Sequence, residues 1–216
     1  MYKTNNNSSA LISEYAQIPK EDKSILIFAV ANTRGSNLTQ LQSDLQEKYT
    51  TVDVMMTERG SVANDVNNNL MPIANNYDLV ICDSYAWGTG NLANQSSLNY
   101  NLITISNDAS MSDNNLIGSS THAETATIEN IESQTGALRD LSINVTNEGE
   151  SNSSITKIRF RSGVRVLMTA KYFDDDSTYD IVGYTTIGAY KQIHSQTVFN
   201  NNYVEVVERL VELAFE

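Results

Sequence analysis

The sequence predicts an α/β domain built on an open, mainly parallel β-sheet, with helices on both faces and a β-rich elaboration in its second half. Two observations predict it. In the first half, apolar runs of strand length alternate with segments whose apolar residues recur at helical spacing. Such alternation implies right-handed βαβ crossovers and therefore a parallel sheet. In the second half, apolar residues recur with a period of two, which is typical of strands.

Four strands and two helices are expected in the first half. Residues 24–31, SILIFAVA, form a continuous apolar run, the pattern of a central strand covered on both faces. The other strands are expected at residues 52–56, 78–84 and 102–106. Helical spacing relates Leu38, Leu41, Leu45 and Tyr49 in one segment, and Val62, Val66, Leu70 and Ile73 in a second segment that Pro72 should interrupt.

The second half, after Asp108, is expected to be β-rich and antiparallel. Two of its strands are expected at residues 179–186 and 187–194, around a short turn. The chain closes with an amphipathic helix on Tyr203, Val206, Leu210 and Leu213. Alternating apolar positions mark the remaining strands: Leu141, Ile143 and Val145, then Ile158 and Phe160, and then Val164, Val166 and Met168.

Residues 24–216 are expected to form a single α/β domain that follows an N-terminal arm of residues 1–23. The arm is polar apart from Leu11, Ile12, Tyr15 and Ile18. Ordering a residue costs about 1–2 kcal/mol of backbone entropy, and burying four apolar side chains returns only about 1.5–3 kcal/mol each. We therefore expect a protein partner or a second copy of the chain to bind through the arm.

Composition argues against several classes of protein. A net charge of -12 disfavours nucleic acids and anionic membranes as partners, because binding phosphates requires a basic face. No apolar run approaches the roughly 20 residues of a membrane span, and the N-terminus lacks the apolar core of a secretory signal. We therefore expect the protein in the cytoplasm or in a virus particle. The single cysteine, Cys82, excludes an internal disulfide and a cysteine-based zinc site.

Ligands of open α/β sheets bind outside the carboxyl ends of the strands, which makes three loops candidates for a site. Residues 32–36 precede a helix N-terminus and residues 85–91 follow the third strand; the third loop is 107–112. A phosphate could be held in the first loop through backbone N–H groups and hydroxyls. The candidate residues are Thr33, Gly35 and Ser36 for the phosphate, and Tyr85 and Trp87 as stacking surfaces.

The first two loops resemble those of flavodoxins over residues 24–92. In that family a hydroxyl- and glycine-rich loop binds the FMN phosphate, and an aromatic residue in a stretch like YDLVICDSYAWGTGNL packs on the flavin. The resemblance implies FMN as an alternative to having no cofactor, with the five loop residues above as its ligands. The chain departs from the family in that Arg34 precedes Gly35 in place of the tight Thr-Gly-x-Thr pattern. Residues 91–100 also leave no room for the family's helix before the fourth strand.

The second half resembles class I glutamine amidotransferase-like domains, including their ThuA-like branch. The resemblance rests on RSGVRVLMTAKYFDDDSTYDIVGYTTIGAYKQIHSQ and the helix after it. In the family, a strand ending in "vLata" leads through a hairpin to a glycine-marked strand and a final helix. The first half fits as well, with YDLVICDSY as the "YDlvvl" strand, so the resemblance spans nearly the whole chain. It implies a flavodoxin-type fold.

Carried over residue by residue, the resemblance implies a degenerate catalytic centre. His194, in QIHSQ, matches the histidine that activates the family's nucleophilic cysteine, but Gln196 stands where a glutamate should orient it. The nucleophile should lie at a glycine-flanked elbow after the fourth strand, where residues 107–109 read Asn-Asp-Ala. Cys82 lies mid-strand and is expected to be a buried structural thiol. Without a thiolate to activate, His194 is expected to be a surface or hydrogen-bonded histidine.

The other candidate groups are weaker. Asp83 and Asp108 lie at strand ends, where they could converge as an acid/base or metal pair, but no histidine accompanies them. Residues 174–176 are expected to form a solvated turn, and His122 near Glu124 has no partner at a recognised metal spacing. No metal site is predicted.

These observations favour a binding or assembly module without catalytic activity. Asparagine clusters at residues 5–7, 67–69 and 200–202, which reflects either a genome of low GC content or the polar surface of an assembled particle. Together with the arm, they suggest a structural component of a phage particle. The alternatives are an FMN-binding redox protein of flavodoxin type and a ThuA-like sugar-processing enzyme, for which no catalytic carboxylates are identified.

Overall fold

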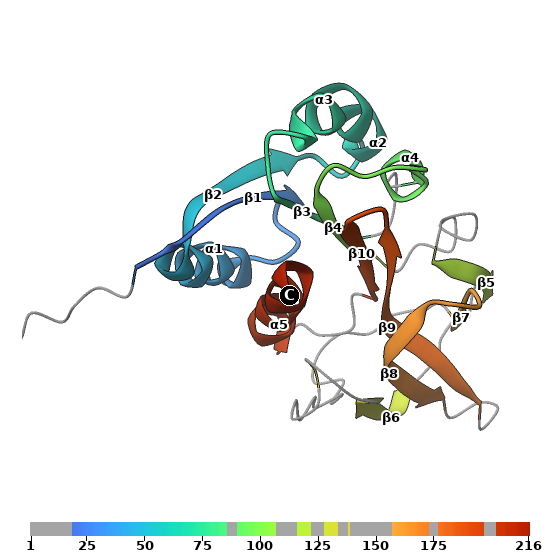
Figure 1. Cartoon of the computed structure of the whole chain (residues 1–216). Helices are drawn as coiled ribbons and strands as arrows, with labels where there is room; N and C mark the ends of the chain where they lie inside the picture. The colour runs from blue at the N-terminus through green and yellow to red at the C-terminus, as the bar shows by residue number, and fades with distance from the viewer. Residues whose placement is uncertain are drawn as a thin grey trace, which may run out of the picture.

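The computed structural model describes residues 19–85, 90–106, 116–121, 128–133, 138, 157–172, 177–196 and 202–216. Within them, the chain forms an open eight-stranded sheet in the order β2-β1-β3-β4-β10-β9-β8-β6, beside a two-stranded sheet of β5 and β7 (Figure 1). The large sheet consists of β1 (Glu21–Val30), β2 (Tyr49–Thr57), β3 (Leu79–Tyr85), β4 (Asn101–Ser106), β6 (Ile128–Ser133), β8 (Arg165–Tyr172), β9 (Thr178–Ile187) and β10 (Tyr190–Ser195). The small sheet consists of β5 (Ile117–Thr121) and β7 (Lys157–Phe160).

Strands β2, β1, β3, β4 and β10 run parallel to one another. The four strands that the first half predicts are confirmed, as is their parallel direction. β1 shows why a central strand is continuously apolar: Ile25, Ile27 and Ala29 belong to the core on one face, and Leu26, Phe28 and Val30 belong to the core on the other. A strand in this position has no solvent-facing side, so polar residues have no place in it.

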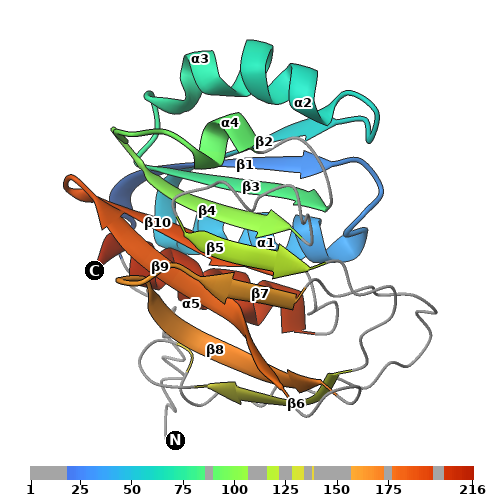
Figure 2. The ribbon, with the colours of Figure 1, turned by 90° about the vertical axis from the view of Figure 1, so that its right-hand side faces the viewer.

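Helices cover both faces of the sheet, as predicted (Figures 1 and 2). α1 (Ser36–Lys48) and α5 (Tyr203–Phe215) pack on one face, against a core that includes Ile25, Ile27 and Ala29. On the other face, the intervening residues of β1 belong to a second core together with α2 and its continuation. That layer comprises α2 (Val62–Asp65), the π-helical turn η1 (Val66–Leu70), α3 (Met71–Ala74) and the short α4 (Gly90–Ala93).

Pro72 modifies the second helix without ending it. Proline lacks an N–H and its ring clashes with the carbonyl four residues earlier, so an α-helix would break there. Here a π-helical turn precedes it and Pro72 lies in the first turn of α3. The predicted interruption is therefore a local widening of the helix.

The second half is antiparallel, as predicted, but it continues the first sheet. β10 pairs parallel with β4 and antiparallel with β9, and β8 and β6 follow antiparallel. The turn around Gly188, with φ 65°, delays the start of β10 to Tyr190, three residues later than predicted. Val164 precedes β8, while Leu141, Ile143 and Val145 lie outside the described residues.

The boundary between arm and domain also differs from the prediction. β1 begins at Glu21, whose Cα pairs with Tyr49, so residues 21–23 belong to the sheet. Residues 1–18, which include the apolar patch of the arm, lie outside the described residues.

Gly183 provides a test of how the small sheet packs on the large one. A Cβ at this position would lie 2.5 Å from Phe160 Cε2 and 3.1 Å from the Arg165 carbonyl oxygen. We expect Gly183→Ala to lower the free energy of unfolding by about 1–3 kcal/mol, because a packed core does not accept an added methyl group without strain. Gly60→Ala, where the new methyl would contact nothing within 4 Å, is the matched control in urea denaturation. Equal stability of the two variants would contradict the packing of Phe160 on Gly183.

Candidate functional site

The crevice expected to hold a ligand lies at the carboxyl ends of β1 and β3. From β1 the chain continues to β2 on one side, whereas β3 and β4 lie on the other side, so the strand order switches between β1 and β3. Open α/β sheets bind ligands at such a switch point. Asp83 in β3 points to the face covered by α1 and α5, because it continues the alternation of Leu79 and Ile81. Arg34 lies in the loop between β1 and α1. These two side chains occupy the crevice.

Arg34 and Asp83 form a buried, two-bonded ion pair. Arg34 Nε donates to Asp83 Oδ2 at 2.7 Å, and Arg34 Nη2 donates to Asp83 Oδ1 at 3.3 Å. The side chains are 2 % and 0 % exposed. The loop turns through Asn32 (φ 63°) and Gly35 (φ 51°), left-handed conformations on either side of the arginine. A buried pair of this kind is stable only because each charge has the other as its partner.

Tyr203, the first residue of α5, covers this ion pair. Its ring centroid lies 4.6 Å from the guanidinium carbon of Arg34, an arrangement that favours a cation–π interaction. The hydroxyl lies near the Asp83 carboxylate without a hydrogen bond of good geometry. Burial, and then the negative charge of Asp83, raise the pKa of Tyr203 well above its usual value. The phenol therefore stays protonated.

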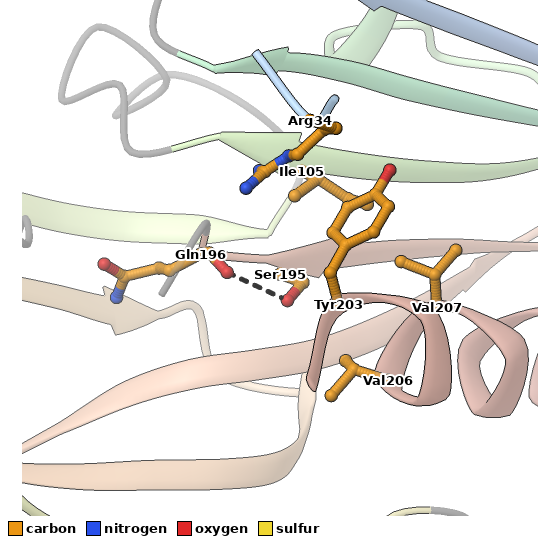
Figure 3. Close-up of a pocket in the computed structure, with 7 residues that line it drawn as sticks. All are labelled: Arg34, Ile105, Ser195, Gln196, Tyr203, Val206 and Val207. Carbon is orange, nitrogen blue, oxygen red and sulfur yellow. Dashed lines mark hydrogen bonds between the residues drawn. The ribbon is translucent and has the colours of Figure 1, made fainter. Parts of the chain in front are cut away.

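Little space remains on the side of the pair that Tyr203 covers. The cavity beside it has a volume of about 10 Å³, which is room for a single water molecule. Figure 3 shows Arg34 beside the Tyr203 ring, while the Gln196 side chain points away from Tyr203. The lining consists of Arg34, Ile105, Ser195, Gln196, Tyr203, Val206 and Val207.

The residues proposed for a phosphate do lie in the loop before α1. Thr33, however, donates its hydroxyl proton to the Val30 carbonyl at 2.7 Å. Gly35 is the N-cap residue of α1. A larger cavity of about 260 Å³ lies beside this loop, between α1 and β2. The side chain of Tyr85 is outside the described part of the chain, and so is Trp87, the other aromatic of the predicted site.

His194 lies on the opposite face of the sheet from Asp83. It pairs across strands with Thr104 of β4, which in turn pairs with Cys82 of β3, so the three side chains form a row on one face. His194 Nδ1 is 3.1 Å from Thr104 Oγ1, and the ring is fully buried against the edge of Phe160. Of the two states expected for His194, the structure shows the hydrogen-bonded one, and the ring is not at the surface. Burial lowers its pKa to about 4, which keeps the ring neutral.

This row brings His194 and Cys82, the one cysteine of the chain, to the same face but keeps them apart. Two strand spacings, about 9–10 Å, separate Cys82 from His194, and Thr104 lies between them. Burial, and then the Asp83 charge, raise the pKa of the Cys82 thiol far above its usual value, so no thiolate forms at neutral pH. Gln196 donates its amide to the Asp180 carbonyl at 2.8 Å, not to His194.

The remaining predicted residues are only partly placed. Asp83 is paired with Arg34, while Asp108, its proposed partner, is outside the described residues, as are His122, Glu124 and residues 174–176. Across the described ranges, no group of three or more His, Cys, Asp or Glu side chains could hold a metal ion. No helix there is long and apolar enough to cross a membrane.

The burial of Cys82 leads to a direct prediction. The thiol is 0 % exposed in the middle of β3, so we expect the native protein to react with a bulky maleimide only as fast as it unfolds. Reaction in urea, where the thiol is free, is the control. Rapid labelling of the native protein would contradict a mid-strand position.

Comparison with known proteins finds no match by sequence and a distant likeness by structure. No family model matches the chain, and no curated protein matches it. Among solved structures, the crystal structure of Agd3, described as a novel carbohydrate deacetylase, is similar with a TM-score of 0.41 and 7% sequence identity. The match covers 82% of this chain and 29% of that chain, so this chain spans less than a third of the deacetylase. A likeness this distant assigns neither a family nor an activity.

Proposed function

We propose that this chain is a non-catalytic binding or assembly module on an amidotransferase-like, flavodoxin-type fold. The observation that carries the proposal is the Arg34–Asp83 ion pair, which occupies the switch-point crevice where this architecture binds ligands. A ligand entering there would have to separate two buried charges and move the Tyr203 ring. Separating such a pair leaves at least one buried charge without a counter-charge, which is strongly unfavourable.

The opposite face of the sheet supports the same proposal. A cysteine–histidine hydrolase needs a thiolate within hydrogen-bond reach of its base. Here Thr104 takes the hydrogen bond of His194, and Cys82 is a protonated thiol two strands away. We place the module in an assembled particle such as a phage virion, as the asparagine-rich composition and the arm favour, with the residues before β1 contributing to association.

FMN binding is the second candidate, favoured by the cavity of about 260 Å³ beside the β1–α1 loop. Titrating the purified protein into FMN while following flavin fluorescence discriminates the two candidates. We expect no saturable quenching, and no ammonia release from glutamine. Stoichiometric FMN binding that Gly35→Val weakens would overturn the proposal in favour of a flavoprotein. Glutaminase activity that Cys82→Ser abolishes would overturn it in favour of an enzyme.

A further inference from the structure

One of the two edges of the large sheet is formed by β2. Among the described strands, β1 is its one neighbour. An edge strand presents unpaired backbone groups that can pair with another chain, and proteins commonly protect such edges with proline, lysine or a bulge. β2, YTTVDVMMT, contains neither proline nor lysine, and Asp53 is its single charged residue. The Asp53 carboxylate accepts a hydrogen bond from the Tyr77 hydroxyl at 2.8 Å.

The direction of the backbone groups along β2 follows from two hydrogen bonds. In a parallel strand, the N–H and C=O of one residue point to the same side, and the next residue points to the other side. The Thr57 carbonyl accepts from the Ala31 N–H at 2.8 Å, so Thr57 points along the sheet toward β1. By alternation, Val54 and Met56 point their backbone groups to the free edge.

The Val52 carbonyl agrees with this assignment. It accepts the side-chain amides of Gln42 and Gln46, both from α1, at 3.4 Å each. α1 therefore covers the edge at Val52 but leaves Val54 and Met56 to be paired from outside. Within the described residues, the part of the edge without a strand partner or a cover is the carboxyl-terminal half of β2.

A groove runs beside this part of the edge. It is the cavity of about 260 Å³ between α1 and β2, with Val54, Met56, Leu38 and Thr39 in its lining. Met56 is 48% exposed. Arg34 is the one charged residue of the lining, and Asp83 neutralises it. The outward backbone groups of Val54 and Met56 thus lie beside an exposed apolar side chain and a groove that could take a further side chain.

We propose that a second copy of this chain pairs with β2 antiparallel, through the same edge, and extends the sheet across a two-fold axis at Met55. This inference rests on the proposed assembly function and names its interface. With the axis at Met55, Val54 of one copy is opposite Met56 of the other, and both residues point outward, as an antiparallel hydrogen-bonded pair requires. Asp53 then lies opposite Thr57, so no two like charges meet.

Charge favours this edge over other surfaces of the chain as the place where two copies associate. Each chain carries a net charge of -12, so two copies repel wherever their acidic surfaces meet. Around the groove the side chains are apolar, hydroxyl or amide, apart from the neutralised Arg34. α1 flanks β2 on one face and the α2–α3 layer flanks it on the other (Figure 1), so the contact can extend beyond the strands toward the roughly 800 Å² per partner of a stable interface.

Light scattering on the full chain and two variants tests the interface. Val54→Pro removes the outward N–H of Val54 and leaves the hydrogen bonds to β1, since proline is tolerated where the N–H faces away from the sheet. Met56→Glu adds like charges on both sides of the axis. Ala189→Glu, in the exposed turn between β9 and β10, adds the same charge away from the edge and is the matched control.

We expect the full chain and Ala189→Glu to have twice the mass of 23.9 kDa at micromolar concentration. Both β2 variants should weaken dimerisation by about 100-fold or more. Met56→Glu adds two carboxylates that lie diagonally across the axis from each other, and Val54→Pro removes strand-pairing hydrogen bonds that are not replaced. Their circular dichroism should match that of the full chain. Met56→Glu keeps the test valid if Val54→Pro fails to fold.

Two outcomes would overturn the inference, and they bear differently on the assembly function. If the variants stay dimeric while deletion of residues 1–18 gives monomers, the interface is the arm and the assembly function stands. If the full chain is a monomer at all concentrations, the inference is wrong and the assembly function loses its support from self-association.

Discussion

Replacing Asp83 with alanine is expected to lower the free energy of unfolding by about 3–5 kcal/mol, the cost of leaving one member of a buried ion pair without its partner. The Arg34 guanidinium would remain in a site where its side chain is 2 % exposed, without the carboxylate that now receives two of its hydrogen bonds. Urea denaturation followed by circular dichroism measures the loss. This is the largest effect that we expect from a single substitution in the described residues.

Two controls separate the buried pair from charge removal in general. Lys48 bridges Glu208 and Glu212 at the surface, and Lys48→Ala should change stability by less than about 1 kcal/mol. The double variant Arg34→Met, Asp83→Leu should recover most of the stability, because apolar side chains of similar volume can replace a buried ion pair. A loss below about 1 kcal/mol in Asp83→Ala would show that the pair is not buried as described.

Acidification from pH 7 to pH 4 is expected to destabilise the protein by up to about 3 kcal/mol through His194 alone. Its pKa is about 4 when folded, because burial disfavours the charged ring, against about 6.5 when unfolded. Above pH 6.5 neither state is protonated at His194, and its contribution does not change. Below pH 6.5 the unfolded state binds the proton first, so stability falls until the pH reaches the folded pKa.

Comparison with His194→Gln isolates this contribution, because other acid-sensitive groups act equally in both proteins. Asp78, whose pKa is lowered mainly by hydrogen bonds from Ser24 against the effect of burial, is one such group. The stability difference between the two proteins should change between pH 6.5 and 4 and be constant at higher pH. The second histidine of the chain is His122, and His122→Gln assigns the two imidazole signals in an NMR titration. A His194 signal that titrates near pH 6.5 would contradict its burial.

The parallel half of the fold could be predicted because its central strands have no exposed face. A run such as residues 24–31 has to be covered on both sides, and its helices carry the matching apolar stripes. The strands of the second half were harder to predict from the sequence. β10 includes Gln192 and His194, buried polar residues that satisfy part of their hydrogen bonding within the fold, so its sequence resembles a surface strand. Periodicity also does not say which strand pairs with which, and pairing of β10 with β4 could not be predicted.

The sequence indicated the two elements that meet at this crevice but not the contact between them. The loop before α1 and the end of β3 were both identified, and Arg34 was noted as a departure from the phosphate-binding pattern. What joins them is a contact between residues 49 positions apart, which depends on the register of β1 against β3 and on the positive φ angles that turn Arg34 inward. The signal for this contact in the sequence was the opposite charge of Arg34 and Asp83, which lie next to the ends of two strands. Nothing in the sequence indicated that Tyr203 contacts Arg34, since Tyr203 was identified only as part of the apolar stripe of α5.

Native mass spectrometry of the full chain, purified without added ligand, tests most directly whether it is an assembly module with an occupied crevice. We expect multiples of 23.9 kDa and no bound small molecule, because Arg34 and Asp83 fill the position that a ligand would take. A monomer that carries the mass of a flavin or another small molecule would contradict the proposal.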